Sequence, residues 1–157
     1  MPVGAYAGSR ALMEQVAPTG PVYQAGTLSG NPVAMAAGLA QLNIITDHPE
    51  IYTVMETSAS YIANHLRASA EKHGIAMQVN QIGSLLCPYF TETPVNCYAA
   101  AKKSDTKRYA AYFNGMLKRG IYLAPSQFEA MFVSSVHTQN DLACTVQAAE
   151  ETLSEMA

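Results

Sequence analysis

The sequence predicts two parts: a small α+β domain over residues 49–157 and, before it, a piece of a larger α/β domain over residues 1–48. The polar run Asp47-His48-Pro49-Glu50 separates two helical patterns and marks the boundary. After it, a long helical pattern gives way to short apolar runs punctuated by glycine, which is typical of helices packed on an antiparallel sheet. The first 48 residues are too few and too rich in glycine to bury a core of their own. We therefore expect them to rest on a sheet that lies outside this sequence.

The first part is predicted to contain a strand, a short helix, a loop and a second helix. Residues 3–7 are apolar enough for a buried strand that ends near Gly8. Ser9 can cap a helix over residues 10–16, which the prolines and glycine that follow bring to an end. Pro32 suits the first turn of the next helix, which is rich in alanine and continues to about Thr46.

The second part is predicted to alternate between helices and short strands. Asp47 can cap a helix over residues 49–73, and Ser104 or Asp105 can cap a later one that ends at Gly120. The remaining predictions are strands over 75–79 and 84–90 with a glycine between them, a loop over 91–104, a helix over 106–119, strands over 121–123 and 131–136, and a helix over 140–156.

Composition and charge exclude several classes of function. Apolar residues make up 49% of the chain and charged residues 13%, which is a globular composition and not a disordered one. The net charge of −3 offers no basic patch for nucleic acid or for an anionic membrane surface. No apolar run approaches the roughly 20 residues that a membrane span needs, and the amino terminus shows no signal peptide.

Cysteine and histidine are not spaced for a disulfide framework or a metal site. Cys87, Cys97 and Cys144 are odd in number and form no Cys-x-x-Cys pair, so we expect buried or half-buried free thiols in a reducing cytosol. The four histidines are scattered, so no zinc site is expected. His137, near the end of the last predicted strand, is expected to be a structural histidine.

The most informative stretch is the loop at residues 22–32, Val-Tyr-Gln-Ala-Gly-Thr-Leu-Ser-Gly-Asn-Pro, which leads directly into the alanine-rich helix. Gly26 and Gly30 let the backbone turn and approach a ligand closely. Thr27 and Ser29 add hydroxyls, and the amides at the start of the helix favour an anion. Such a loop can hold a phosphate. The alternative, on these residues alone, is an ordinary turn followed by a helix cap.

Three stretches of the chain match one enzyme family in the family's own order. They are residues 1–38, with Met-Pro-Val-Gly-Ala-Tyr and the loop just described, Ala-Lys-Lys-Ser-Asp-Thr at 101–106, and residues 120–138, with Ala-Pro-Ser-Gln-Phe-Glu-Ala. Through these motifs the chain resembles the class III aminotransferases, and among them the glutamate-1-semialdehyde 2,1-aminomutases, over essentially its whole length.

The resemblance implies the C-terminal part of a fold-type I transferase that uses pyridoxal 5′-phosphate or pyridoxamine 5′-phosphate. It implies a cytoplasmic homodimer, or a plastid enzyme in a photosynthetic eukaryote. The reaction would exchange the amino and oxo groups of a small molecule, glutamate-1-semialdehyde, to give 5-aminolevulinate, the precursor of haem and chlorophyll. The lysine that holds the cofactor, and the aspartate that pairs with its pyridine nitrogen, would lie upstream of Met1. None of the five lysines is therefore nominated as catalytic, and we expect these residues alone to be inactive.

The resemblance also implies roles for individual residues. Gly26 and Thr27 would contact the phosphate of a cofactor held by the neighbouring subunit, and Tyr23 would line that subunit's substrate pocket. A core or interface tyrosine is the alternative for Tyr23. Glu129 stands where related transaminases carry an arginine that grips the substrate carboxylate; a negative charge there repels such carboxylates and favours an amino group. An exposed loop carboxylate is the alternative for Glu129, and Gln127 with its neighbour Ser126 is expected to shape the backbone.

The chain departs from the family pattern at Ala7-Gly8-Ser9, at Met131 and at Leu85-Leu86-Cys87-Pro88. Pro88 lacks an amide hydrogen, so it favours an edge position for its strand. Two other functions stay open. One is a class III aminotransferase that moves amines between separate substrates, which an arginine in place of Glu129 would favour. The other is a non-catalytic module for folding or dimerisation.

Overall fold

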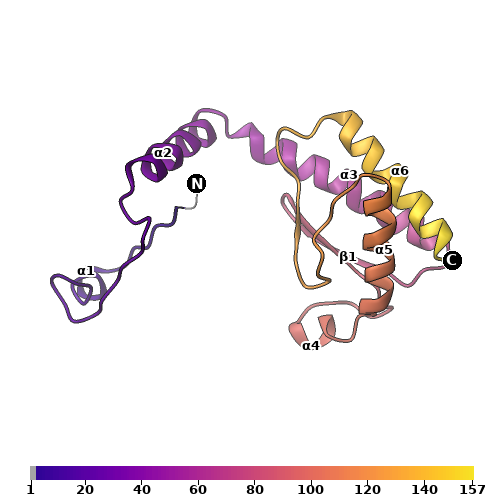
Figure 1. Ribbon diagram of the computed structural model, residues 1–157, viewed down its shortest axis with the longest axis horizontal. Coiled ribbons are helices and arrows are strands. Elements are labelled where there is room, and N and C mark those ends of the chain that lie inside the picture. Colours follow the sequence, from indigo (N-terminus) through magenta and orange to yellow (C-terminus); the bar gives the residue numbers. More distant parts are fainter. Residues whose placement is uncertain (1–2) are drawn as a thin grey trace. The chain divides into compact units, whose positions relative to one another are not determined.

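The computed structural model describes residues 3–157, and the chain divides into two units, Met1–Pro49 and Glu50–Ala157. The first unit contains α1 (Arg10–Met13) and α2 (Pro32–Asp47). The second contains α3 (Glu50–Lys72), β1 (Gln78–Ile82), β2 (Leu85–Tyr89), α4 (Tyr98–Ala101), α5 (Thr106–Lys118), β3 (Met131–Phe132) and α6 (Gln139–Glu155); Figure 1 labels all of these except β2 and β3. None of the helices in residues 3–157 is both long and apolar enough to cross a membrane.

The sheet of the second unit is antiparallel, with the strand order β1-β2-β3. Ile82 pairs with Leu85, so β1 and β2 are joined by a two-residue hairpin turn. Gly83 occupies the first position of that turn with a φ of +51°, a conformation that glycine adopts without steric cost. The predicted antiparallel sheet is confirmed.

One stripe of α3 supplies much of the core of the second unit. Ala59, Ile62, Ala63, Leu66 and Ala70 recur at the three- and four-residue spacing that places side chains on one face of a helix. This face packs against the sheet and against α6, and α5 packs against α6 in turn (Figure 1). The buried residues of this cluster are Ala59, Ile62, Ala63, Leu66, Ala70, Ile75, Val79, Leu86, Phe90, Tyr109, Tyr112, Met116, Val133, Leu142, Ala148, Ala149 and Leu153.

Four of the predicted strands are wrong in whole or in part. Residues 3–7 and 121–123 form no strand, the strand predicted over 131–136 shrinks to Met131–Phe132, and the strand predicted over 75–79 lies three residues later, at Gln78–Ile82. A strand exists only where a neighbour accepts its hydrogen bonds, and within residues 3–157 no neighbour pairs with the first two segments. Ile121 and Leu123 pack on the core from irregular backbone, so their alternation reflects burial and not sheet pairing.

Pro88 lies in the middle strand of the sheet, so its predicted edge position is wrong. It pairs with Val79 of β1, and in an antiparallel ladder only every second pair exchanges hydrogen bonds, which leaves places where a missing amide hydrogen does no harm. On its other side β3 pairs only with Leu85 and Leu86 and stops before Pro88. The chain there is irregular, and Gln127 Nε2 donates to the Pro88 carbonyl at 2.6 Å.

Helix ends follow the predicted capping chemistry in some places and depart from it in others. Asp105 caps α5 by accepting from two backbone amides, and Gly120 follows the helix with a φ of +81°, as predicted. Ser9 stands at the start of α1 but its side chain caps nothing, and the helix predicted over 10–16 ends already at Met13. Asp47 is the last residue of α2 and not the cap of α3, so that prediction is wrong. The predicted loop at 91–104 contains the short helix α4.

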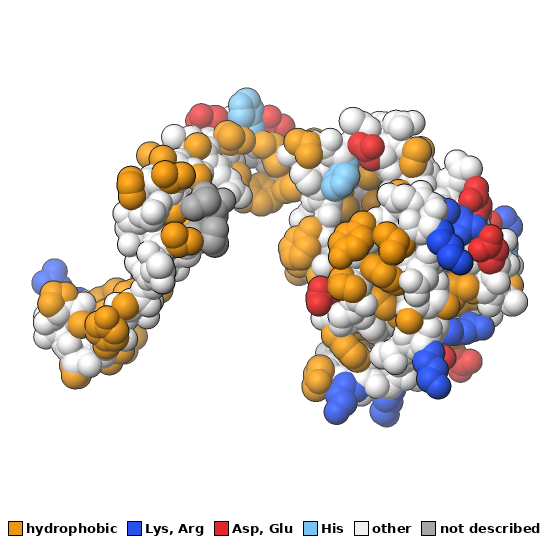
Figure 2. All heavy atoms as spheres, in the orientation of Figure 1, with side chains coloured by type: hydrophobic (Ala, Val, Ile, Leu, Met, Phe, Trp, Pro, Cys, Tyr) orange, Lys and Arg blue, Asp and Glu red, His pale blue; other side chains and the backbone are white. Residues whose placement is uncertain are grey.

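The first unit leaves most of its apolar side chains exposed. In α2 only Ala34 and Gly38 are buried, four residues apart on one face. Figure 2 shows hydrophobic side chains, in orange, over the visible surface of this unit. The exposed ones include Val22, Leu28, Val33, Met35, Leu39, Leu42 and Ile44. An apolar surface of this extent is characteristic of a segment that packs against other protein.

Candidate functional site

The loop before α2 is shaped by short-range hydrogen bonds. The Ser29 amide donates to the Gly26 carbonyl at 2.9 Å, and the Asn31 amide donates to the Leu28 carbonyl at 3.1 Å. Gly30 has a φ of +71°, which a residue with a side chain rarely adopts. A Cβ added at Gly26 would lie 2.8 Å from Ser29 Oγ, so a larger residue here would require the exposed Ser29 side chain to rotate away.

The start of α2 is less available to an anion than the sequence predicts. Asn31 Oδ1 accepts from the amides of Val33 and Ala34 at 3.0 and 3.1 Å. Pro32, at the first helical position, has no amide hydrogen to offer. The expectation that the first helical amides are free for a phosphate is therefore wrong for Val33 and Ala34, because the Asn31 side chain already occupies them. Donors for an anion have to come from the loop itself.

A hollow of about 580 Å³ lies beside this loop within the first unit. Gly26, Ser29 and Gly30 form one side of it, and the rest of the wall is Val3, Gly4, Tyr6, Gln24, Leu28 and Met35. Thr27 and Tyr23 are both exposed, Tyr23 to 83%. The loop therefore exposes a hydroxyl and an aromatic ring, although neither residue lines the hollow.

Glu129 lies in the second unit, on the irregular segment that connects α5 to β3. It is exposed, and its amide donates to the Ser126 carbonyl at 3.1 Å. It stands at the wall of a pocket of about 390 Å³ that reaches down to the core. The other lining residues are Ile62, Leu66, Leu86, Tyr112, Met116, Ile121, Tyr122, Leu123, Ala124, Pro125, Ala130, Met131, Phe132, Val133, His137, Leu142 and Thr145. A carboxylate at the wall of a mostly apolar pocket suits an amino group on a small molecule.

Tyr109 lies under the same segment, where burial and the charge of Glu129 both affect the pKa of its hydroxyl. Its hydroxyl donates to the Ala124 carbonyl at 2.5 Å. Burial raises the pKa of Tyr109 to about 12, with further contributions from nearby Cys87 and Glu129. Burial also raises the pKa of the Cys87 thiol. Both groups are therefore neutral near pH 7 and act as hydrogen-bond donors.

Two other side chains, Cys87 and His137, form hydrogen bonds near this pocket, and the partners of Cys87 could not be predicted from the sequence. The Cys87 thiol lies 3.5 Å from the Gln127 carbonyl and 3.6 Å from the Glu129 carbonyl. No sequence signal could have paired β2 with a segment about 40 residues later. His137 lines the pocket as well, where its Nδ1 accepts from the Ser134 amide at 2.9 Å.

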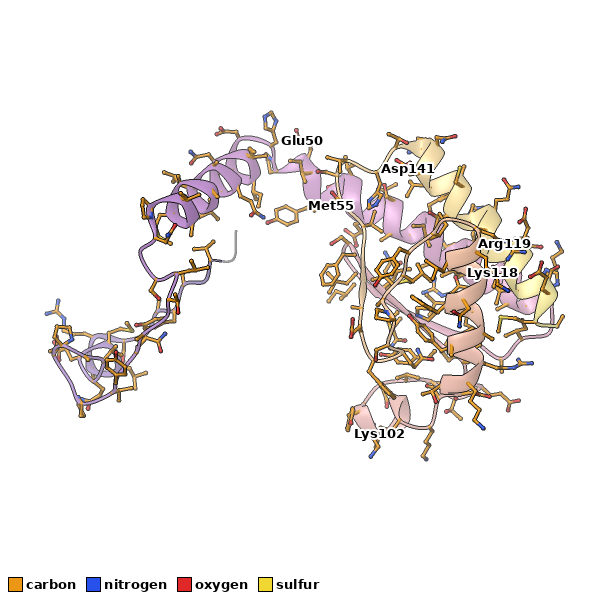
Figure 3. All side chains as sticks on the ribbon, viewed as in Figure 1. Glu50, Met55, Lys102, Lys118, Arg119 and Asp141 are labelled. Carbon is orange, nitrogen blue, oxygen red and sulfur yellow. The ribbon has the colours of Figure 1, made fainter. Side chains whose placement is uncertain are left out.

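The cysteines and lysines lie outside the loop at 22–32 and do not line the pocket beside Glu129, although Cys87 contacts the segment that carries Glu129. In residues 3–157 all three cysteines are free, but Cys97 and Cys144 are exposed, so the prediction of buried or half-buried thiols holds only for Cys87. All five lysines are exposed. Figure 3 labels two of them, Lys102 beside α4 and Lys118 at the end of α5. Within residues 3–157 no cluster of histidine, cysteine and acidic residues is arranged to hold a metal ion.

Comparison with known proteins confirms the resemblance. Residues 1–151 match the family model described as aminotransferase class-III. The chain is 59% identical, over 99% of its length, to a glutamate-1-semialdehyde 2,1-aminomutase of Ruminiclostridium cellulolyticum, and 52% identical, over 98%, to glutamate-1-semialdehyde 2,1-aminomutase 2 of Lachnoclostridium phytofermentans. It spans 36% of the length of each of these relatives.

The fold is confirmed independently of sequence. A solved transaminase with PLP bound superimposes with a TM-score of 0.76 at 22% identity, covering 95% of this chain and 34% of that one. The predicted fold class, part of a fold-type I transferase, is therefore correct. Since the family model covers nearly all of the sequence, the chain belongs to the class-III aminotransferase family.

Proposed function

We propose that this chain is part of an enzyme that converts glutamate-1-semialdehyde into 5-aminolevulinate, in the biosynthesis of haem and chlorophyll. The observation that carries the proposal is Glu129, a carboxylate at the wall of an apolar pocket in a chain 59% identical to a named aminomutase. A carboxylate attracts the ammonium group of an amino aldehyde and repels the carboxylate of an ordinary amino acid. The alternative, transfer of amines between two substrates, is favoured by an arginine at this place, and the chain has none there.

The cofactor proposed is pyridoxal 5′-phosphate or pyridoxamine 5′-phosphate. When bound, it supplies a carrier for the amino group and withdraws electrons from the reacting carbon. The loop at 22–32 fits a phosphate: Gly26 lets the backbone come close, and Thr27 offers an exposed hydroxyl. Because Asn31 occupies two of the first amides of α2, the hydroxyl of Thr27 and the amides of the loop are the donors proposed for the phosphate.

The enzyme is proposed to be a cytoplasmic homodimer in which Gly26 and Thr27 serve the cofactor of the neighbouring subunit and Tyr23 lines its substrate pocket. The apolar surface of the first unit supports packing against further protein. The lysine that holds the cofactor is proposed to lie upstream of these residues, because all five lysines here are exposed. The purified 157-residue chain should then show no PLP absorbance shifted toward the visible band and no turnover.

The test of the proposed function uses the holoenzyme and glutamate-1-semialdehyde as sole substrate. An aminomutase forms 5-aminolevulinate without any separate amino acceptor, whereas a transaminase needs one. Glu129→Gln should lower kcat/KM at least tenfold, because it removes the charge that attracts the substrate ammonium. Glu92→Gln, which removes another exposed carboxylate of the same unit, is the control and should leave kcat/KM unchanged. Equal activity of Glu129→Gln and the unmodified enzyme would refute the assignment.

The phosphate contact has its own test. Thr27→Ala should raise the dissociation constant of the cofactor about 10- to 150-fold, since a hydrogen bond to a charged group contributes about 1.5–3 kcal/mol. Thr27→Ser keeps the hydroxyl and should retain the cofactor nearly as well as the unmodified enzyme. Dialysis against increasing volumes, with PLP absorbance as the readout, separates the two variants. Identical retention by Thr27→Ala and Thr27→Ser would show that the hydroxyl has no role.

A further inference from the structure

The segment that carries Glu129 has no regular secondary structure, yet it is tied to β2 by bonds that run in both directions. From β2, the Cys87 thiol is in reach of two carbonyls of the segment, that of Gln127 at 3.5 Å and that of Glu129 at 3.6 Å. From the segment, Gln127 Nε2 donates to the Pro88 carbonyl of β2 at 2.6 Å. Cys87 and Gln127 are both buried, Gln127 to within 2% of complete burial. Water therefore competes little for these bonds.

These bonds constrain three successive peptide units around Glu129. The carbonyl between Gln127 and Phe128 and the carbonyl that follows Glu129 both face the Cys87 thiol. The amide between Phe128 and Glu129 donates to the Ser126 carbonyl at 3.1 Å. With the peptide units on both sides held, the direction of the Cα–Cβ bond of Glu129 is fixed, because that direction depends only on the backbone.

Packing alone does not explain an amide at position 127. Gln127 Oε1 is buried and has no hydrogen-bond partner within residues 3–157, which destabilises the fold. An apolar side chain of similar length would fill the same space without that penalty. What the amide adds, and methionine could not, is the bond to the Pro88 carbonyl.

We propose that Cys87 and Gln127 are positioning residues for Glu129, which together hold its backbone so that the Cα–Cβ bond directs the side chain from a fixed place at the wall of the pocket. This inference rests on the proposed role of Glu129 in binding the substrate. It assigns a specific role to Cys87, one of the places where the chain departs from the family pattern. A carboxylate displaced by even 1 Å meets the substrate ammonium less favourably, so loosening the segment should act on substrate affinity.

The first experiment measures local order in the chain itself. Gln127→Met removes the unpartnered oxygen of Gln127 but leaves the buried Pro88 carbonyl without its donor, so the two effects oppose each other and the midpoint of urea unfolding should change little. Hydrogen exchange of the Glu129 amide should nevertheless become at least tenfold faster. Ser104→Ala is the matched control, because it removes another buried oxygen without a partner, away from this segment, and should leave that exchange rate unchanged. Unaltered Glu129 exchange in Gln127→Met would overturn the proposal.

The second experiment measures function in the holoenzyme with glutamate-1-semialdehyde. Gln127→Met and Cys87→Ala should each raise KM several-fold with a smaller change in kcat. Cys87→Ser keeps a donor and should recover part of the loss, which a purely structural effect of the smaller side chain would not do. Glu129→Gln distinguishes failure of the proposed function from failure of the positioning role. If Glu129→Gln changes nothing, the proposed function fails; if it raises KM while Gln127→Met and Cys87→Ala do not, the positioning role fails.

Discussion

Replacing Gly115 with alanine should destabilise the second unit, although a glycine-to-alanine change stabilises a helix at a solvent-exposed position. Gly115 lies in α5 where that helix meets α6. A Cβ added there would lie less than 3.0 Å from Thr152 Cγ2, and 3.1 Å from Thr152 Oγ1. Carbon atoms in contact normally lie about 3.5–4.0 Å apart. Thr152 is only 2% exposed, so its side chain has little room to move away.

Two opposing terms set the size of the effect. Alanine is favoured over glycine in a helix interior by about 1 kcal/mol. Overpacking a buried contact costs about 1–3 kcal/mol. The net change for Gly115→Ala is therefore a loss of roughly 1 kcal/mol in the free energy of unfolding. In a chain that also carries Thr152→Ala, the nearest remaining atom is Cβ at 3.3 Å, so Gly115→Ala should there be neutral or stabilise by up to about 1 kcal/mol.

Urea unfolding of the four chains of this double-mutant cycle, followed by circular dichroism, measures both terms. The expected coupling between positions 115 and 152 is about 1–3 kcal/mol. Stabilisation by Gly115→Ala with Thr152 intact would contradict this expectation, because the two helices would then leave room for a methyl group. Additive effects of the two substitutions would also contradict it, because no contact between the two positions would then exist.

Three further substitutions test other parts of the second unit. Glu150 pairs with Lys72 and His73, which hold its pKa at about 2, below the ordinary value of 4.5. Glu150→Gln should therefore destabilise near pH 7 by up to about 1 kcal/mol, and the difference should vanish as the pH falls from 4.5 towards 2, as urea unfolding at several pH values would show. Asp105→Ala removes the cap of α5 and should lower the free energy of unfolding by about 1 kcal/mol. Asp105→Asn retains a capping oxygen and should retain most of that stability in the same assay. Leu66→Ala opens a cavity in the core and should lower the free energy of unfolding by about 3–5 kcal/mol, measured by thermal or urea unfolding. A smaller loss would show that the core is not tightly packed at Leu66.

The helices could be predicted from the sequence because their signals are local. The long helices begin and end within three residues of the predicted bounds, since apolar periodicity and caps such as Asp105 lie within the helix itself. Strands were predicted less well, because a strand is defined by a partner that the sequence does not identify. Ile121 and Leu123 alternate as a strand does, yet they lie in irregular chain. Pro88 looked like an edge residue for the same reason, since only the register shows which of its sides lacks a neighbouring strand.

The candidate site could be predicted only as far as its residues belong to continuous motifs. Glu129, Thr27 and Gly26 were found because each lies in a run of family-like residues, and their roles stay predictions. The Asn31 cap is also local, but it could not be told apart from a free helix start, because asparagine in a loop has several possible partners. The bonds of Cys87 to the segment about 40 residues later depend on the folded structure alone.

The irregular segment and its polar anchors have one physical origin. Between α5 and β3 the chain passes over the core without a sheet neighbour, so its carbonyls cannot be satisfied by a ladder. Side chains satisfy them instead, because the Tyr109 hydroxyl donates to the carbonyl of Ala124 and the single hydrogen of the Cys87 thiol is shared between the carbonyls of Gln127 and Glu129. A strand in the same place would have sent successive side chains to alternate faces of the sheet. In a strand, residues 127 and 129 would therefore lie on the same face. The irregular backbone has no such alternation, so Glu129 can stand exposed at the wall of the pocket while Gln127, two residues before it, is buried.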